Sequence, residues 1–266
     1  MMVSAIVIFD IDGVIRDVGG SYRRALADTV EHFTAGAYRP SQEDIDDLKA
    51  EGIWNNDWEA SQELIRRYFQ DQEEGQPELA YAAIVAFFQS RYRGPDPERW
   101  TGYICDEPLL VKPAYFAALE AAGLQWGFFS GATRGSASYV VESRLGLQPP
   151  VLIAMEDAPG KPDPTGLLDA VRQCRDRINP VSTLAVIYAG DTVADIRTVV
   201  NARSVQPDIT WIAVGILPPH VQDRDAHRIS YTDRLHQAGA AVVFDHIEQL
   251  TPEQIQRLII SQQSIG

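Results

Sequence analysis

Residues 5–14, AIVIFDIDGV, decide the fold. The apolar run Ala5–Phe9 is typical of a strand that is buried on both faces of a parallel sheet, and two aspartates, Asp10 and Asp12, follow it directly. Gly13 indicates that the chain is already turning at this point. In open α/β sheets, ligands bind outside the carboxyl ends of the strands. The stretch therefore predicts either a functional site at a sheet edge or, equally well on its own, two aspartates that open a surface turn.

Similar short apolar runs recur along the chain, each bounded by Gly, Pro, Asp or Ser: Gln125–Phe129, Val151–Ala154, Leu184–Ala189, Ile209–Val214 and Ala241–Phe244. Helical patterns lie between them, at Pro113–Ala122, Ser136–Leu145, Pro164–Cys174 and Asp195–Ser204. This alternation predicts an α/β fold with a doubly wound parallel sheet and a Rossmann-like core. The segment Leu217–Arg228 is expected to be a long loop that borders the site.

Between Asp17 and about Cys105 the sequence contains helical patterns and no convincing strand. Ser41, with Asp44 three residues later, is the signal of a capped helix start. Nearly ninety residues are thus inserted after the first strand. We expect residues 18–105 to form an α-helical cap domain, and residues 1–17 and 106–266 to form the α/β catalytic core.

A second pair of aspartates follows the run Leu184–Ala189, in the sequence Gly190-Asp191-Thr192-Val193-Ala194-Asp195. Four carboxylates at two strand ends of one sheet indicate a divalent cation that prefers oxygen ligands. Mg²⁺ fits, because it takes one or two carboxylates together with waters and phosphate oxygens. A second interpretation of Asp195 stays open, namely an acid at a helix N-terminus that interacts with the helix dipole.

Two further strand ends carry groups that suit a phosphate. Ser130-Gly131-Ala132-Thr133 is a loop of small residues before a helix, with a hydroxyl and backbone N–H groups that can hold phosphate oxygens. Lys161 lies between Gly160 and Pro162, in a segment rigid enough to fix an ammonium that neutralises phosphate charge. Taken singly, the loop is a common feature, and an ordinary surface lysine is the first interpretation of Lys161.

In this order the four segments resemble the motifs of the haloacid dehalogenase-like hydrolase superfamily: D-x-D-G, a hydrophobic strand that ends in Ser or Thr, a lysine before a helix, and G-D-x-x-x-D. They are Asp10–Gly13, Ser130, Lys161 and Gly190–Asp195. The resemblance covers the α/β core, and the helical insert is similar to the type 1 cap of phosphoglycolate phosphatases and β-phosphoglucomutases.

The resemblance implies a role for each motif residue. Asp10 is the nucleophile that forms an aspartyl-phosphate, and Asp12 is the general acid and then the general base. Asp10, the backbone carbonyl of Asp12 and Asp191 hold Mg²⁺, and Asp195 supports them directly or through water. Ser130, the Gly131 N–H and Lys161 bind the non-transferring phosphate oxygens. An acid at Asp12 favours phosphoryl chemistry over dehalogenation, since the dehalogenases of the superfamily generally lack it.

Several residues stay open between substrate binding and structure. Arg16 either binds a substrate anion or pairs with Asp17. The string Trp54-Asn55-Asn56-Asp57-Trp58 either faces a small polar ligand or is an aromatic turn between helices. Arg134 follows the Ser130 loop and is open in the same way.

Composition limits the partners and the location. The chain has 266 residues and 23 Lys and Arg against 37 Asp and Glu, a net charge of −14. Such a chain repels nucleic acid, and no apolar run approaches the length of a membrane span. Cys105 and Cys174 are far apart, so a disulfide framework or zinc site is not expected. We expect a cytoplasmic enzyme, monomeric or homodimeric, that is a Mg²⁺-dependent phosphatase of a small phosphorylated metabolite. The alternatives are a sugar phosphomutase and a non-catalytic binding protein.

Overall fold

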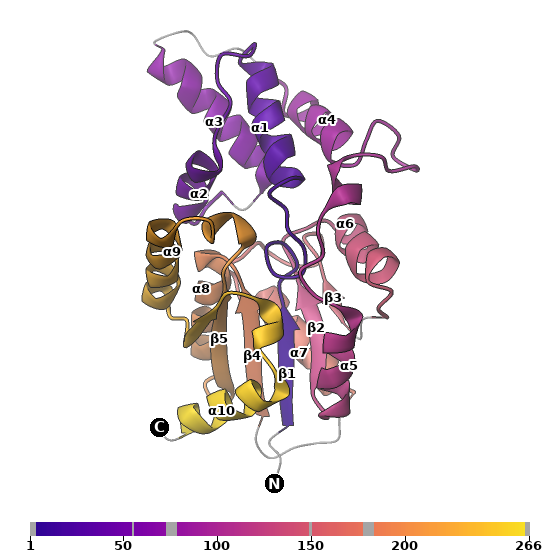
Figure 1. Ribbon diagram of the computed structural model, residues 1–266, viewed down its shortest axis with the longest axis vertical. Coiled ribbons are helices and arrows are strands. Elements are labelled where there is room, and N and C mark those ends of the chain that lie inside the picture. The colour runs from indigo at the N-terminus through magenta and orange to yellow at the C-terminus, as the bar shows by residue number, and fades with distance from the viewer. Residues whose placement is uncertain (1–3, 55, 73–78, 149–150, 178–183, 264–266) are drawn as a thin grey trace. The chain divides into compact units, whose positions relative to one another are not determined.

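The computed structural model describes residues 4–54, 56–72, 79–148, 151–177 and 184–263. It divides into two compact units. One unit combines Met1–Arg16 with Leu109–Gly266, and the other is Asp17–Pro108. Figure 1 follows the chain through both.

The larger unit is built on a six-stranded sheet in the order β3-β2-β1-β4-β5-β6, in which every pairing is parallel. The strands are β1 (Ser4–Phe9), β2 (Gln125–Phe129), β3 (Leu152–Ile153), β4 (Leu184–Gly190), β5 (Thr210–Ile216) and β6 (Val242–Phe244). The expected α/β fold with a parallel sheet is confirmed, and each strand overlaps an apolar run of the sequence.

Strand β1 lies in the interior of the sheet, and its side chains alternate between two cores. Ile6 and Ile8 pack into the core beneath helices α7 and α8, whereas Val7 and Phe9 pack into the core on the other face. All four side chains are fully buried, which at roughly 1.5–3 kcal/mol for each side chain strongly fixes the register of the strand. The register places Phe9 opposite Phe128 of β2 and Ala189 of β4. The residues that follow these three therefore emerge together at one edge of the sheet.

Helices cover both faces of the sheet (Figure 1). They are α5 (Pro113–Ala121), α6 (Arg134–Ser138) with a π-helical continuation (Tyr139–Arg144), α7 (Thr165–Arg175), α8 (Val193–Val205), α9 (Asp225–Ala238) and α10 (Pro252–Gln263), with 3₁₀ turns at Pro219–Val221 and Ile247–Gln249.

The expectation of a long loop over Leu217–Arg228 is wrong for the last residues of this segment. A 3₁₀ turn occupies Pro219–Val221, and α9 begins at Asp225. Only Leu235 of α9 is buried. The helix therefore has no apolar stripe from which its start could have been predicted.

The smaller unit consists of α1 (Tyr22–Phe33), α2 (Gln42–Ala50), α3 (Asp57–Asp71), α4 (Tyr81–Tyr92) and a 3₁₀ turn at Tyr103–Asp106, with no strand among its described residues. The predicted capping box at the start of α2 is confirmed, since the Ser41 side chain accepts from the Asp44 N–H and the Asp44 side chain accepts from the Ser41 N–H. A buried ion pair between Arg23 and Asp46 joins α1 to α2, with a 2.6 Å contact. No helix among the described residues combines the length and the apolar composition that crossing a membrane requires.

A test of the packing under the site uses Gly166, near the start of α7. A Cβ atom at this position would lie 2.3 Å from a ring carbon of Phe129 in β2. We predict that Gly166→Ala lowers the free energy of unfolding by about 1–3 kcal/mol, although alanine is the better helix former. Gly160→Ala, where no heavy atom lies within 4 Å of the added Cβ, is the matched control. Urea denaturation checks this, and equal stability of the two variants would contradict the packing argument.

Candidate active site

Three buried carboxylates gather at the carboxyl edge of the sheet. Asp10 follows β1, Asp191 follows β4, and Asp195 lies in the first turn of α8. Each offers a carboxylate oxygen, and these oxygens all lie within 4.8 Å of one another. The two strand ends thus bring together side chains that are about 180 residues apart in the sequence. The backbone fixes this meeting, because the Asp10 N–H donates to the Ala189 carbonyl at 2.8 Å.

Lys161 neutralises part of this charge. Its Nζ lies 2.8 Å from Oδ1 of Asp10 and 2.6 Å from Oδ1 of Asp195, and its side chain is 8% exposed. The rings of Phe129 and Tyr188 lie 5.2 and 5.4 Å from the ammonium. Lys161 is therefore a fixed internal cation, and the surface-lysine interpretation does not describe it.

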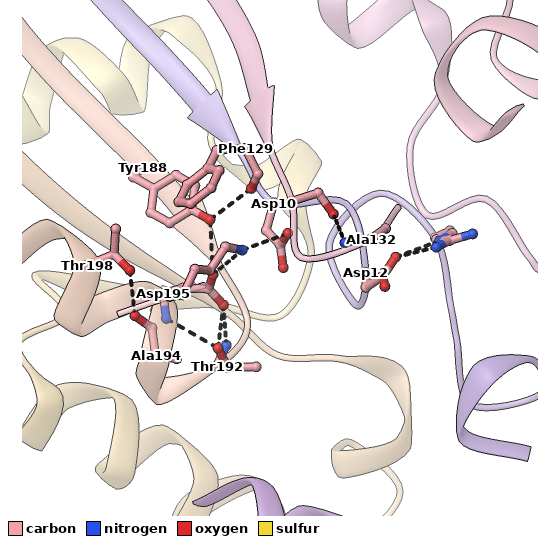
Figure 2. A network of polar contacts seen from close by, with 12 residues as sticks. Asp10, Asp12, Phe129, Ala132, Tyr188, Thr192, Ala194, Asp195 and Thr198 are labelled. Atoms are coloured by element: carbon pink, nitrogen blue, oxygen red, sulfur yellow. Dashed lines mark hydrogen bonds and ion pairs between the residues drawn. The ribbon is translucent and has the colours of Figure 1, made fainter. Parts of the chain in front are cut away.

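Asp195 uses both of its carboxylate oxygens within the protein (Figure 2). Oδ1 accepts from Lys161 and from the Tyr188 hydroxyl at 3.0 Å. Oδ2 accepts from the N–H and the hydroxyl of Thr192, at 2.9 and 2.5 Å. Asp195 thus caps α8, as the helix-acid interpretation has it, and also positions Lys161. With its oxygens engaged in this way, it suits support of a metal site better than direct ligation.

The carboxylate of Asp191 is placed differently. Within the described residues it forms no hydrogen bond and no ion pair, although the residue is only 8% exposed. Gly13, with φ of +74°, lies against it, and a Cβ at Gly13 would lie 2.1 Å from Asp191 Oδ2. Only glycine fits both this turn and this close approach. The glycine of the D-x-D-G turn thus leaves room for the Asp191 carboxylate.

The cluster holds more negative charge than one lysine offsets. Burial raises the pKa of Asp10 to about 7, with Asp195 and Asp12 adding to the rise and Lys161 opposing it. Burial also raises the pKa of Asp191 well above its usual value, helped by Asp195 and Asp10. Burial disfavours the charged form of Lys161 as well, but Asp10 and Asp195 more than compensate, so its pKa is raised.

These charges fit a divalent cation. Asp10 and Asp191 supply buried oxygen ligands at close range, and a hard cation beside them would relieve the cost of burying both as anions. Asp12 is not part of this group of oxygens. Its side chain accepts a hydrogen bond from Arg16 at 2.7 Å, and the resemblance assigns only its backbone carbonyl to the metal.

The Ser130 loop follows directly from β2. Ser130 is 1% exposed, its N–H donates to the Ile153 carbonyl at 3.0 Å, and its hydroxyl accepts from the Ala132 N–H at 3.1 Å. The Gly131 N–H donates no hydrogen bond to any described residue. This N–H is therefore available to an oxyanion, as the resemblance implies.

Two arginines for which the sequence allowed either a substrate-binding or a structural role, Arg134 and Arg16, contact other residues of the protein. Arg134 pairs with Asp157 and donates to the Leu152 carbonyl at 3.2 Å, so it joins the loops after β2 and β3. Arg16 is fully buried, and its Nε–H donates to Oδ1 of Asp12 at 2.7 Å.

The tryptophan string of the smaller unit runs into α3, whose first two residues are Asp57 and Trp58. Asn56 is the N-cap of this helix, and its side chain accepts from the Trp58 N–H at 2.9 Å. The Trp54 indole donates to Glu51 at 2.8 Å. Asn55 lies outside the described residues. These contacts match the interpretation as a turn between helices.

Two contributors were missed in the sequence. Tyr188 counted only as an apolar strand residue, yet its hydroxyl lies 3.0 Å from both Asp195 and the Phe129 carbonyl. Thr192 was recognisable, because Thr192 and Asp195 have the spacing of a capping box, which the structure contains.

With this fold and this arrangement of carboxylates, the chain belongs to the haloacid dehalogenase-like hydrolase family, whose model matches residues 5–203. The expected resemblance is confirmed. Among solved structures, it is similar to a phosphonoacetaldehyde hydrolase-like protein from Oleispira antarctica (TM-score 0.65, 16% identity, 96% of this chain and 93% of that one). It is also similar to phosphatase Tt82 from Thermococcus thioreducens (TM-score 0.59, 22% identity, 85% of this chain and 98% of that one).

A curated relative is longer. An imidazoleglycerol-phosphate dehydratase of Phytophthora nicotianae is 29% identical over 245 residues, which cover 89% of this chain and 49% of that protein. The chain therefore spans about half the length of this relative.

The unpartnered carboxylate predicts an unusual stability effect. The pKa of Asp191 is raised in the folded protein. Ionisation of this carboxyl therefore destabilises the fold once the pH rises above the pKa that Asp191 has in the unfolded chain. We predict that Asp191→Asn raises the thermal midpoint at pH 8 without metal by about 2 °C or more, and that this gain shrinks toward pH 4. Mg²⁺ should raise the midpoint of the wild type by mass action and barely affect the variant.

Calorimetry with EDTA or with millimolar Mg²⁺ measures both effects. Asp208→Asn, at an exposed position, is the control that removes a charge without touching the cluster. An equal Mg²⁺ response in wild type and Asp191→Asn would contradict the assignment of Asp191 as a ligand.

Proposed function

We propose that the chain is a Mg²⁺-dependent phosphatase that hydrolyses a small phosphomonoester through an aspartyl-phosphate on Asp10. The observation that carries the proposal is a pair of buried carboxylates, Asp10 and Asp191, beside a lysine that Asp195 fixes. A nucleophilic carboxylate with a second carboxylate and a buried cation beside it suits phosphoryl transfer, in which positioning and charge neutralisation supply most of the catalysis.

In the first half-reaction, a carboxylate oxygen of Asp10 attacks phosphorus and the bond from phosphorus to the ester oxygen breaks. Asp12 donates its proton to that oxygen, so the alcohol leaves neutral. In the second half-reaction, the Asp12 carboxylate takes a proton from water as the water oxygen attacks phosphorus. The bond between phosphorus and Asp10 breaks, and inorganic phosphate is released with Asp10 regenerated.

The remaining groups hold the phosphoryl oxygens. Lys161, the Ser130 hydroxyl and the Gly131 N–H are the donors proposed for them, and they stabilise the charge that develops in the transition state. Bound Mg²⁺, held by Asp10, the Asp12 carbonyl and Asp191, would neutralise phosphate charge beside the nucleophile.

The helical unit Asp17–Pro108 is proposed to select the substrate as a cap. It is inserted directly after the D-x-D-G turn, and the chain re-enters the core beside this turn, where the Leu110 N–H donates to the Ile15 carbonyl at 2.8 Å. Because Asn56 caps α3 and Trp54 pairs with Glu51, we do not assign substrate contacts to them.

The name of the longer relative suggests a class of substrate to test first. That protein is named for an activity on an imidazole-bearing phosphomonoester, and this chain matches about half of it. We therefore propose phosphomonoesters that carry an imidazole ring as the leading substrate candidates. A panel that pairs them with plain sugar and glycolate phosphates of equal charge tests this, and a preference for the plain esters would reject it.

A phosphomutase remains the second candidate, since it would use the same aspartates. Conversion of one sugar phosphate to its isomer, dependent on trace bisphosphate, would favour it over hydrolysis. A binding protein without turnover would release no phosphate from any ester.

The nucleophile is tested with an aryl phosphate. We predict that hydrolysis requires Mg²⁺ and that Asp10→Asn lowers kcat by on the order of a thousandfold or more, because the attacking carboxylate is lost. Asp208→Asn is the control. Release of aryl alcohol is the measurement, and retention of more than about a tenth of the activity in folded Asp10→Asn would remove Asp10 from this role.

The acid is tested by the leaving group. Asp12→Asn should lower kcat for alkyl phosphates by about 100-fold or more and much less for aryl phosphates, because a stable oxyanion leaves without a proton. Steady-state kinetics on a series of esters measures the ratio. Equal losses on both classes would show that Asp12 is not the acid.

A further inference from the structure

The proposed general acid, Asp12, contacts a buried cation, Arg16. The Arg16 guanidinium contacts Asp12 through Nε at 2.7 Å and through a terminal nitrogen at 2.6 Å. Both contacts fall on the same oxygen of Asp12, Oδ1, and dashed lines mark them beside the Asp12 label in Figure 2. The Arg16 side chain is fully buried, whereas that of Asp12 is 22% exposed.

The backbone between the two residues is tightly folded, which fixes the pair. The Gly13 N–H donates to the Arg16 carbonyl at 2.9 Å, and the N–H groups of Ile15 and Arg16 both donate to the Ile11 carbonyl, at 2.8 and 3.2 Å. The Leu110 N–H donates to the Ile15 carbonyl at 2.8 Å, so the returning chain holds the turn from the other side. A buried guanidinium is costly unless it is paired, and the Asp12 carboxylate offsets part of this cost.

The geometry points to a defined task for Arg16. We propose that Arg16 is a positioning residue for the acid–base step: it holds Oδ1 of Asp12, so that Oδ2 is the oxygen that gives and takes the proton. The inference rests on the proposed function, since the step it serves is the proton transfer to the leaving group. The Arg16 side chain is fully buried, which argues against a role for Arg16 in substrate binding.

The kinetic test compares esters with poor and good leaving groups. Arg16→Met keeps the bulk of the side chain and removes the charge-assisted bonds. We expect it to lower kcat for an alkyl phosphate by about 10–100-fold and for an aryl phosphate by about threefold or less, with KM nearly unchanged. Arg16→Lys should recover part of the alkyl activity. Arg228→Met, which removes a surface pair with Asp245, is the matched control and should leave the alkyl-to-aryl ratio as it is.

A double-mutant cycle separates positioning from general damage. If Arg16 acts through Asp12, adding Arg16→Met to Asp12→Asn should cost less than about twofold more in alkyl activity. Losses that multiply, or equal losses on both ester classes, would overturn the proposal.

Crystal structures provide a readout that does not require turnover. In Arg16→Met we expect the Asp12 carboxylate to leave its wild-type position while Asp10, Lys161 and Asp195 stay in place. An Asp12 that keeps its position would overturn the proposal even if no substrate is known. Absence of phosphatase activity in the wild type, by contrast, would reject the proposed function and not this coupling.

Discussion

The Lys161 ammonium lies between two buried carboxylates, 2.8 Å from Asp10 and 2.6 Å from Asp195. The arrangement of the candidate site depends on this bridge. It connects the end of β1 to the start of α8, and Tyr188 and Thr192 hold Asp195 so that the lysine has one position. A lysine fixed in this way leaves Asp10 oriented, buried and partly neutralised, which is what an attack on a phosphoryl group requires.

The same arrangement carries a cost in stability. Lys161 is shared by two carboxylates, and Asp191 is buried beside them with no partner among the described residues. A fold selected for stability alone would not retain that aspartate, whereas a fold that binds a divalent cation and a phosphate requires it. The Asp12 carboxylate also adds to the rise in the pKa of Asp10, although Arg16 contacts it within the same turn of the chain. In the proposed mechanism the two aspartates have separate tasks, nucleophilic attack at Asp10 and proton transfer at Asp12.

Much of the fold and of the candidate site was predictable from local sequence patterns. The features that were not predictable have physical reasons that can be named. The strands were recognisable because strands buried on both faces read as continuous apolar runs, as Leu184–Gly190 does. The convergence of Asp10 and Asp191 followed from the parallel sheet. The start of α9 was missed because it buries only Leu235. The pairing of Arg16 with Asp12, and not with its neighbour Asp17, depends on how the turn closes, and neither charge nor spacing distinguishes the two.

The proposed mechanism requires that Asp10 receives the phosphoryl group beside a metal held by Asp10 and Asp191. A crystal structure with Mg²⁺ and beryllofluoride, which mimics an acyl phosphate, tests it most directly. We expect beryllium bonded to a carboxylate oxygen of Asp10, a Mg²⁺ ion contacting Asp10 and Asp191, and Lys161 with the Ser130 loop on the fluorides. Beryllofluoride on any other residue, or an Asp191 carboxylate that does not contact the metal, would contradict this mechanism.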